Sequence, residues 1–122
     1  MYIRHTSNPQ NETNDCAIRS FANAEGKEWK EVAKEIFDMA LEQYRMPNDF
    51  FVICDYADKH GYEEGYVYQD SPITVGQFVA QHPTGEYVLL LEDHALSVIN
   101  GDYYDLVDCA NANIKQYWTI SE

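Results

Sequence analysis

Residue types that can perform nucleophilic catalysis occur in this chain at positions that folding can bring together. Cys16 follows the polar run Gln10 to Asp15 and opens an apolar helical pattern. The free N–H groups and the dipole at a helix N-terminus stabilise an anion, so a thiol placed there ionises more readily than one within a helix. A nucleophilic thiol also needs a base within hydrogen-bond reach and an acceptor that orients this base. His94 is the best candidate for the base, because it opens a predicted strand and aspartates follow on the next strand.

The spacing around Cys16 and His94 adds specificity. Gln10 precedes Cys16 by six residues, with Asp15 directly before the cysteine, and Asp108 follows His94 by fourteen residues. This Gln-x-x-x-x-Asp-Cys opening, followed far downstream by His and Asp, resembles papain-like cysteine peptidases. It is especially similar to the small bacteriocin-processing peptidase domains.

The chain also resembles short papain-like proteins that are common in bacteriophage and bacterial genomes. The likeness covers about residues 10–118 in the same order. It lies in Asn-Asp-Cys-x-x-Arg at 14–19, Thr-Val-Gly-x-Phe at 74–78 and His-Ala-Leu-x-Val-Ile-x-Gly-x-Tyr-Tyr-Asp-x-x-Asp-Cys at 94–109.

The resemblance implies a role for each matching residue. Cys16 would be the nucleophile, and His94 the general base that later protonates the leaving amine. Asp108 would accept a hydrogen bond from the His94 ring, and Gln10 would donate to the oxyanion together with the backbone N–H of Cys16. The implied activity is an intracellular cysteine hydrolase that cleaves a peptide, isopeptide or thioester bond and needs no cofactor. Arg19, one turn after Cys16, is interpreted as a structural partner of an acidic residue such as Asp15.

Strand geometry alone leaves the third catalytic residue open between two aspartates. With a two-residue turn between the strands, His94 faces Val107, and Asp105 lies on the same side of the sheet as His94. A three-residue loop or a bulge would instead place Asp108 directly across from His94. The resemblance favours Asp108, which we adopt as the predicted third member.

The elements that must position these residues begin with helices in the first half of the chain. Apolar residues recur there at helical spacing, which predicts helices over residues 17–22, 29–44 and 50–57. The apolar faces of the second and third helices, including Leu41, Tyr44 and Phe50, are assigned to the core. Thr74 and Gln77 form a capping-box pattern, which predicts a short helix over 75–81.

From Glu86 onward the apolar period changes to two. This pattern predicts four strands, over residues 87–91, 94–99, 103–107 and 114–120. Asn100-Gly101 lies between the second and third of these strands and is a strong hairpin signal. The prediction is a single α+β domain over residues 1–122, with N-terminal helices packed on a C-terminal antiparallel β-sheet. The papain-like fold that the resemblance implies agrees with this layout.

Composition argues against several classes of function and location. The chain has 8 Lys and Arg against 21 Asp and Glu, a formal net charge of -13, so binding to nucleic acid or to an anionic membrane is disfavoured. Its four histidines show no metal-ligand spacing, and its glycines form no phosphate-binding or dinucleotide motif, so no metal or cofactor is expected. Its apolar runs are shorter than a membrane span, and its three cysteines form no disulfide framework. We therefore expect a cytoplasmic protein with free thiols.

The second half of the chain is especially acidic, because Lys115 is the only Lys or Arg among residues 62–122. Nearby carboxylates, those of Glu92 and Asp93 among them, are expected to raise the pKa of both His94 and Cys16. The expected substrate is a peptide or protein, with a basic or flexible segment favoured. Two alternatives stay open: a catalytically inactive papain-fold protein that binds a basic partner as an inhibitor or nucleic-acid mimic, and an acyltransferase or transglutaminase-type enzyme with the same residues.

Overall fold

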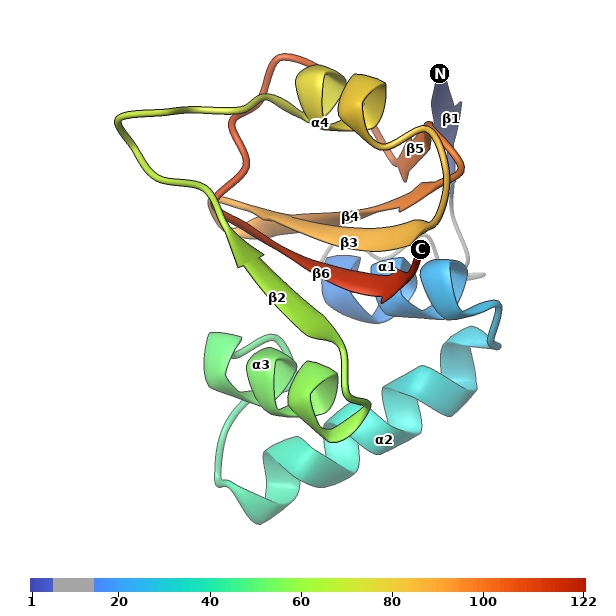
Figure 1. Cartoon of the computed structure of the whole chain (residues 1–122). Helices are drawn as coiled ribbons and strands as arrows, with labels where there is room; N and C mark the ends of the chain where they lie inside the picture. Colours follow the sequence, from blue (N-terminus) through green and yellow to red (C-terminus); the bar gives the residue numbers. More distant parts are fainter. Residues whose placement is uncertain (6–14) are drawn as a thin grey trace.

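A six-stranded sheet forms the middle layer of the fold in the computed structural model, which describes residues 1–5 and 15–122 (Figure 1). The strands are β1 (Tyr2–Arg4), β2 (Glu63–Tyr66), β3 (Glu86–Leu91), β4 (His94–Ile99), β5 (Asp102–Asp105) and β6 (Gln116–Ser121). Their order across the sheet is β1-β5-β4-β3-β6-β2, and every neighbouring pair is antiparallel except β1 and β5. The sheet is therefore mixed, and the prediction of a purely antiparallel sheet is wrong, because the N-terminal segment adds a parallel strand beside β5.

Helices cover both faces of this sheet (Figure 1). One face carries α4, and the other carries the remaining helices of the described residues. Their bounds are α1 (Cys16–Glu25), α2 (Trp29–Glu42), α3 (Phe50–Lys59) and α4 (Val75–Gln81). The α+β class and the four predicted helices are confirmed.

Local sequence signals explain where these helices begin and end. Gly26 ends α1 in a left-handed conformation at φ 68°, which glycine adopts without steric cost. The Asp49 side chain caps α3 by accepting from the backbone N–H of Phe51. The predicted capping box at α4 is present, because Thr74 and Gln77 exchange hydrogen bonds between side chain and backbone.

Alternate residues of β3 face two separate hydrophobic cores. Val88 packs with Trp118 against α1, α2 and α3, whereas Leu89 belongs to the core beneath α4. Phe21 of α1 contacts the Trp118 ring, with ring centroids 5.6 Å apart. The alternation that defined the strands in the sequence therefore distributes their side chains between the two faces.

Helix α1 lies directly against β4 because the facing residues of β4 are small. Ala95 and Ser97 are both buried, and Asn23 of α1 donates a hydrogen bond to the Ser97 hydroxyl at 2.8 Å. This close approach brings the start of α1, where Cys16 lies, next to the start of β4, where His94 lies.

The hairpin of β4 and β5 adopts the register of a two-residue turn. Ser97 pairs with Tyr104 and Ile99 pairs with Asp102. Both residues of the Asn100-Gly101 turn have positive φ, at 47° and 83°, as a type I′ turn requires. The shifted register that would place Asp108 across from His94 is therefore not adopted.

Some sequence-based expectations about burial and strand bounds are wrong. Leu41, Tyr44 and Phe50 are exposed, by 76%, 98% and 48%. The apolar face of α2 is wider than the surface that its neighbours cover, and α2 ends before Tyr44. The third predicted strand ends at Asp105 rather than at residue 107. No helix of the described segments is long and apolar enough to cross a membrane.

Replacing Trp118 with alanine should lower the free energy of unfolding by about 3–5 kcal/mol, because the buried indole leaves a cavity. Leu41→Ala, on the exposed face of α2, should change it by less than about 0.5 kcal/mol. Urea unfolding followed by circular dichroism measures both values. Similar small losses in the two variants would contradict the central position of Trp118.

Candidate active site

The thiol of Cys16 and the imidazole of His94 lie near enough for each to shift the pKa of the other, although they are far apart in the sequence. Cys16 is the first residue of α1, and His94 is the first residue of β4. The backbone of Ala95 also lies near enough to the Cys16 sulfur to lower the pKa of the thiol. Two of the predicted catalytic residues are therefore brought together.

The carboxylate that orients His94 belongs to Asp105. Nε2 of His94 lies 2.6 Å from Oδ2 of Asp105, whose side chain is fully buried. The prediction that Asp108 accepts from this ring is wrong, since Oδ1 of Asp108 instead accepts from the Tyr103 hydroxyl at 2.7 Å. The two-residue turn places Asp105 on the same side of the sheet as His94, as strand parity predicts, and β5 ends at Asp105.

Both oxygens of Asp105 are satisfied by donors. Oδ2 accepts from His94 and also from the Cys109 thiol at 3.5 Å. Oδ1 accepts from the backbone N–H of Leu106 at 2.8 Å and lies 3.4 Å from Nη2 of Arg19. A buried carboxylate needs hydrogen-bond donors of this kind, because removing an unpaired carboxylate from water costs roughly several kcal/mol.

Arg19 and its partners extend this network away from His94. Nη1 of Arg19 donates to Oδ1 of Asp15 at 2.7 Å, which confirms the predicted pairing of these two residues. The other carboxylate oxygen of Asp15 accepts from the indole N–H of Trp29, on α2, at 2.9 Å. Arg19 and Asp15 are both buried.

The surroundings of Cys16 and His94 shift their pKa values in opposite directions. Burial alone would raise the pKa of the Cys16 thiol, but hydrogen bonds from His94 and Ala95 and the charges of His94 and Arg19 bring it below its usual value. The hydrogen bonds to Asp105 and Cys16 raise the pKa of His94 to about 9, against the effect of burial. The expected rise is therefore confirmed for His94 and wrong for Cys16, where donors at close range dominate. These shifts favour a thiolate–imidazolium pair at neutral pH.

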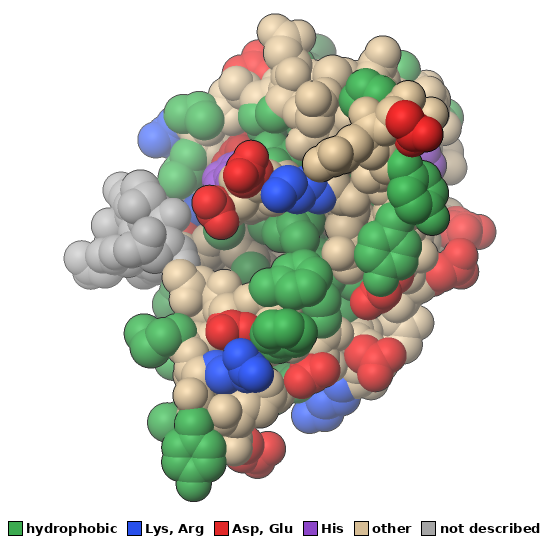
Figure 2. Space-filling view, turned by 90° about the vertical axis from the view of Figure 1, so that its left-hand side faces the viewer, with side chains coloured by type: hydrophobic (Ala, Val, Ile, Leu, Met, Phe, Trp, Pro, Cys, Tyr) green, Lys and Arg blue, Asp and Glu red, His purple; other side chains and the backbone are tan. Residues whose placement is uncertain are grey.

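Cys16 and His94 line one cavity of about 560 Å³. The apolar walls of this cavity come mainly from α3 and β3, and its polar side chains come from the segments next to these elements and from the start of β6. The further lining residues are Ala17, Asn48, Phe50, Ile53, Leu90, Leu91, Asp93, Ala95, Lys115 and Gln116. Figure 2 shows a hollow in the surface, with acidic and basic side chains on its upper rim and hydrophobic side chains below it.

Gln116 contributes a polar group to this cavity that the sequence analysis missed. It lines the cavity, only 5% of its surface is exposed, and its amide nitrogen has no hydrogen-bond partner within the described residues. The amide lies near enough to Cys54 to affect that thiol, but without hydrogen-bond geometry. A single Gln in a strand carries no sequence signal for such a position. An unpaired buried donor costs about 1–3 kcal/mol, so it favours a bound acceptor.

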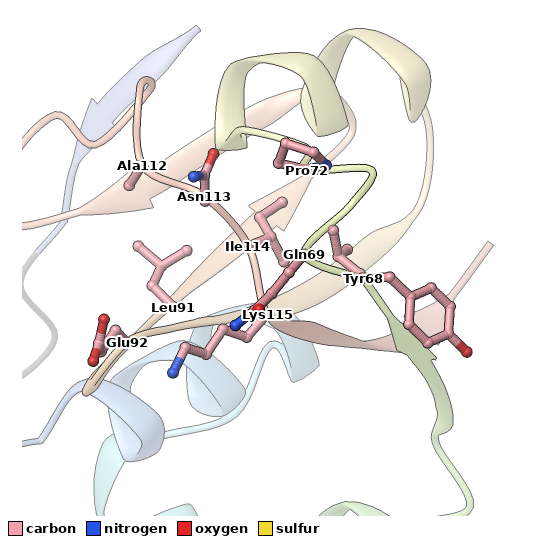
Figure 3. A pocket seen from close by; sticks show the side chains of 10 residues that line it. Tyr68, Gln69, Pro72, Leu91, Glu92, Ala112, Asn113, Ile114 and Lys115 are labelled. Carbon is pink, nitrogen blue, oxygen red and sulfur yellow. The ribbon is translucent and has the colours of Figure 1, made fainter.

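A second cavity, of about 500 Å³, shares Leu91 and Lys115 with the first. Figure 3 shows Leu91 and Glu92 on one side of the view and Pro72 and Tyr68 on the other, with Gln69, Ile114 and Lys115 between them. The Tyr68 ring extends away from the other labelled side chains. The two cavities therefore adjoin each other along Leu91 and Lys115.

The remaining predicted site residue, Gln10, lies outside the described residues, and its role stays a prediction. The backbone N–H groups in the first turn of α1 have no partner within the helix, and the N–H of Cys16 is one of them. Among the described side chains, no three His, Cys, Asp or Glu residues gather in a group that could hold a metal ion.

No family model matches this chain, and neither curated proteins nor solved structures gave a significant match. The chemistry of the site is therefore inferred from its geometry alone.

Iodoacetamide should label Cys16 before the other two cysteines at neutral pH. All three thiols are free and partly buried, but burial and nearby carboxylates raise the pKa of Cys54 to about 11 and that of Cys109 to about 12. Because the thiolate is the reactive form, the lowered pKa of Cys16 gives it the advantage. Mass spectrometry of proteolytic peptides measures the order of labelling, with Cys16→Ser as the control. Equal labelling of the three cysteines would contradict the assignment of Cys16 as an activated thiol.

Proposed function

We propose that this chain is a papain-like cysteine hydrolase that cleaves a peptide, isopeptide or thioester bond with Cys16, His94 and Asp105. The observation that carries the proposal is that His94 lines one cavity together with Cys16 and binds the buried Asp105 carboxylate. A nucleophile, a base and a residue that orients the base are the parts that acyl transfer needs.

The proposed reaction begins from the thiolate–imidazolium pair. The Cys16 sulfur attacks the carbonyl carbon, a C–S bond forms, and the carbonyl electron pair moves to oxygen. His94 then donates its proton to the leaving amine, alkoxide or thiolate as the scissile bond breaks. Water then attacks the resulting thioester and gives one proton to His94. The C–S bond breaks, which releases the carboxylic acid and restores the thiolate–imidazolium pair.

Asp105 and the start of α1 support these steps in different ways. Asp105 binds Nε2 of His94, so the other ring nitrogen is the one that can serve the Cys16 sulfur. The N–H of Cys16, at the positive end of the helix dipole, can donate to the oxyanion. Gln116 can donate its unpaired amide N–H to a substrate carbonyl within the same cavity.

The cavity residues favour a polypeptide substrate that is neutral or basic near the scissile bond. Asp93 lines the first cavity and Glu92 the second, and both are exposed. Lys115 lines both cavities and adds a positive charge to them, so a strongly cationic segment is not required. The cavity shared by Cys16 and His94 supports chemistry over the alternative of an acidic binding protein.

Asp105→Asn should lower the turnover of p-nitrophenyl acetate by about 10²–10⁴-fold, because it weakens the orientation and the charge of the His94 imidazolium. Asp108→Asn is the matched control and should keep turnover within about threefold of the unmodified protein, since Asp108 contacts Tyr103 instead. Release of p-nitrophenolate measures both rates. An Asp108 variant that loses as much activity as the Asp105 variant would contradict the proposed triad.

Turnover should follow a bell-shaped pH profile. It should rise as Cys16 deprotonates at the acid limb, and fall as His94 loses its proton near its pKa of about 9. Cys16→Ala should abolish turnover. A simple amine added in competition with water separates hydrolysis from acyl transfer, because an acyltransferase yields mainly the amide and a hydrolase yields mainly acetate. Turnover that survives in Cys16→Ala would overturn the proposal.

A further inference from the structure

Arg19 connects the two ends of the candidate site while lying outside its cavity. The residue is one turn after Cys16 on α1, and only 3% of it is exposed. One guanidinium nitrogen lies 2.7 Å from Asp15, the residue before Cys16, and another lies 3.4 Å from Asp105, the partner of His94. The Arg19 guanidinium thereby connects the start of α1, where Cys16 lies, with the carboxylate that binds His94.

The contacts of Asp105 show what this planar group controls. Arg19 and the Leu106 N–H both act on Oδ1, which leaves Oδ2 directed at His94. A guanidinium presents its donors in a fixed plane, so it restricts rotation of a carboxylate more than an ammonium does. Asp15 is itself held by the Trp29 indole, which fixes the other end of Arg19.

We propose that Arg19 is a positioning residue, which holds Asp105 in the rotation that directs His94 toward Cys16. This inference rests on the proposed function. A contribution to folding stability does not by itself explain the buried Arg19. A buried ion pair is often no more stabilising than apolar residues of the same volume. The positive charge of Arg19 also contributes to the lowered pKa of Cys16.

Two substitutions separate the charge of Arg19 from its geometry. Arg19→Met removes both, so the iodoacetamide reactivity of Cys16 should shift to higher pH, and kcat for p-nitrophenyl acetate should fall by about 10- to 100-fold. Arg19→Lys keeps the charge, so the reactivity profile should stay near that of the unmodified protein while kcat still falls. KM should stay unchanged in both variants, because Arg19 does not line the cavity.

Glu25→Gln is the matched control, since it also changes a buried charged group on α1. The Glu25 carboxylate accepts hydrogen bonds from the hydroxyls of Tyr56 and Tyr62, away from the candidate site. This variant should leave both kcat and the Cys16 reactivity profile unchanged. A structural role for Arg19 predicts that Glu25→Gln and Arg19→Met behave alike.

The outcomes distinguish this inference from the proposed function. If Cys16 of the unmodified protein reacts as an ordinary thiol and supports no turnover, the proposed function fails. If Cys16 is activated but Arg19→Met matches Glu25→Gln in kcat and in reactivity profile, the role of Arg19 is overturned. Should Arg19→Met not fold, Arg19→Lys decides, and an unchanged kcat in that variant also overturns it.

Discussion

The hydrogen bond between His94 and the buried carboxylate of Asp105 constrains the rest of the site. A carboxylate that is fully removed from water must be surrounded by donors, and Asp105 receives them from three further groups. One of these donors, Arg19, needs its own acid partner, and Asp15 meets that need with help from Trp29 on α2. The chain of contacts from α2 to β4 is therefore a consequence of burying one charge.

Short-range contacts outweigh the overall charge of the molecule at Cys16. The chain carries a net charge of -13, which by itself opposes a thiolate. However, Glu92 and Asp93 are exposed, so water and salt weaken the effect of their charges more than that of buried groups. His94, Ala95 and Arg19 lie near the sulfur, and their combined effect lowers the pKa of the Cys16 thiol against the effect of burial. Net charge is thus a poor guide to the chemistry of a partly buried group.

Much of the layout could be predicted from periodicity, because long amphipathic helices and alternating strands have strong local signals. The strands β1 and β2 could not, since they have three and four residues and depend on pairing with distant partners. The exposure of Leu41 also depends on how far α1 and α3 extend over α2, which no local pattern records.

At the site, Cys16 and His94 could be predicted from their positions at the starts of two elements. Whether Asp105 or Asp108 lies beside His94 depends on the length of the turn between β4 and β5. A two-residue Asn-Gly turn predicts Asp105, which is the residue that contacts His94. The contact of Arg19 with Asp105 spans 86 residues of sequence and follows from the packing of α1, so it could not be read from the chain.

The small side chains on β4 have a consequence for how this sequence can diverge over evolutionary time. Ala95 and Ser97 let α1 approach the sheet, and the same approach brings sulfur and imidazole together. A lineage that acquires bulkier residues there can repack its helices and stay folded, because cores tolerate gradual changes of volume. Such a descendant would lose the proximity of Cys16 and His94 while both residue types are retained.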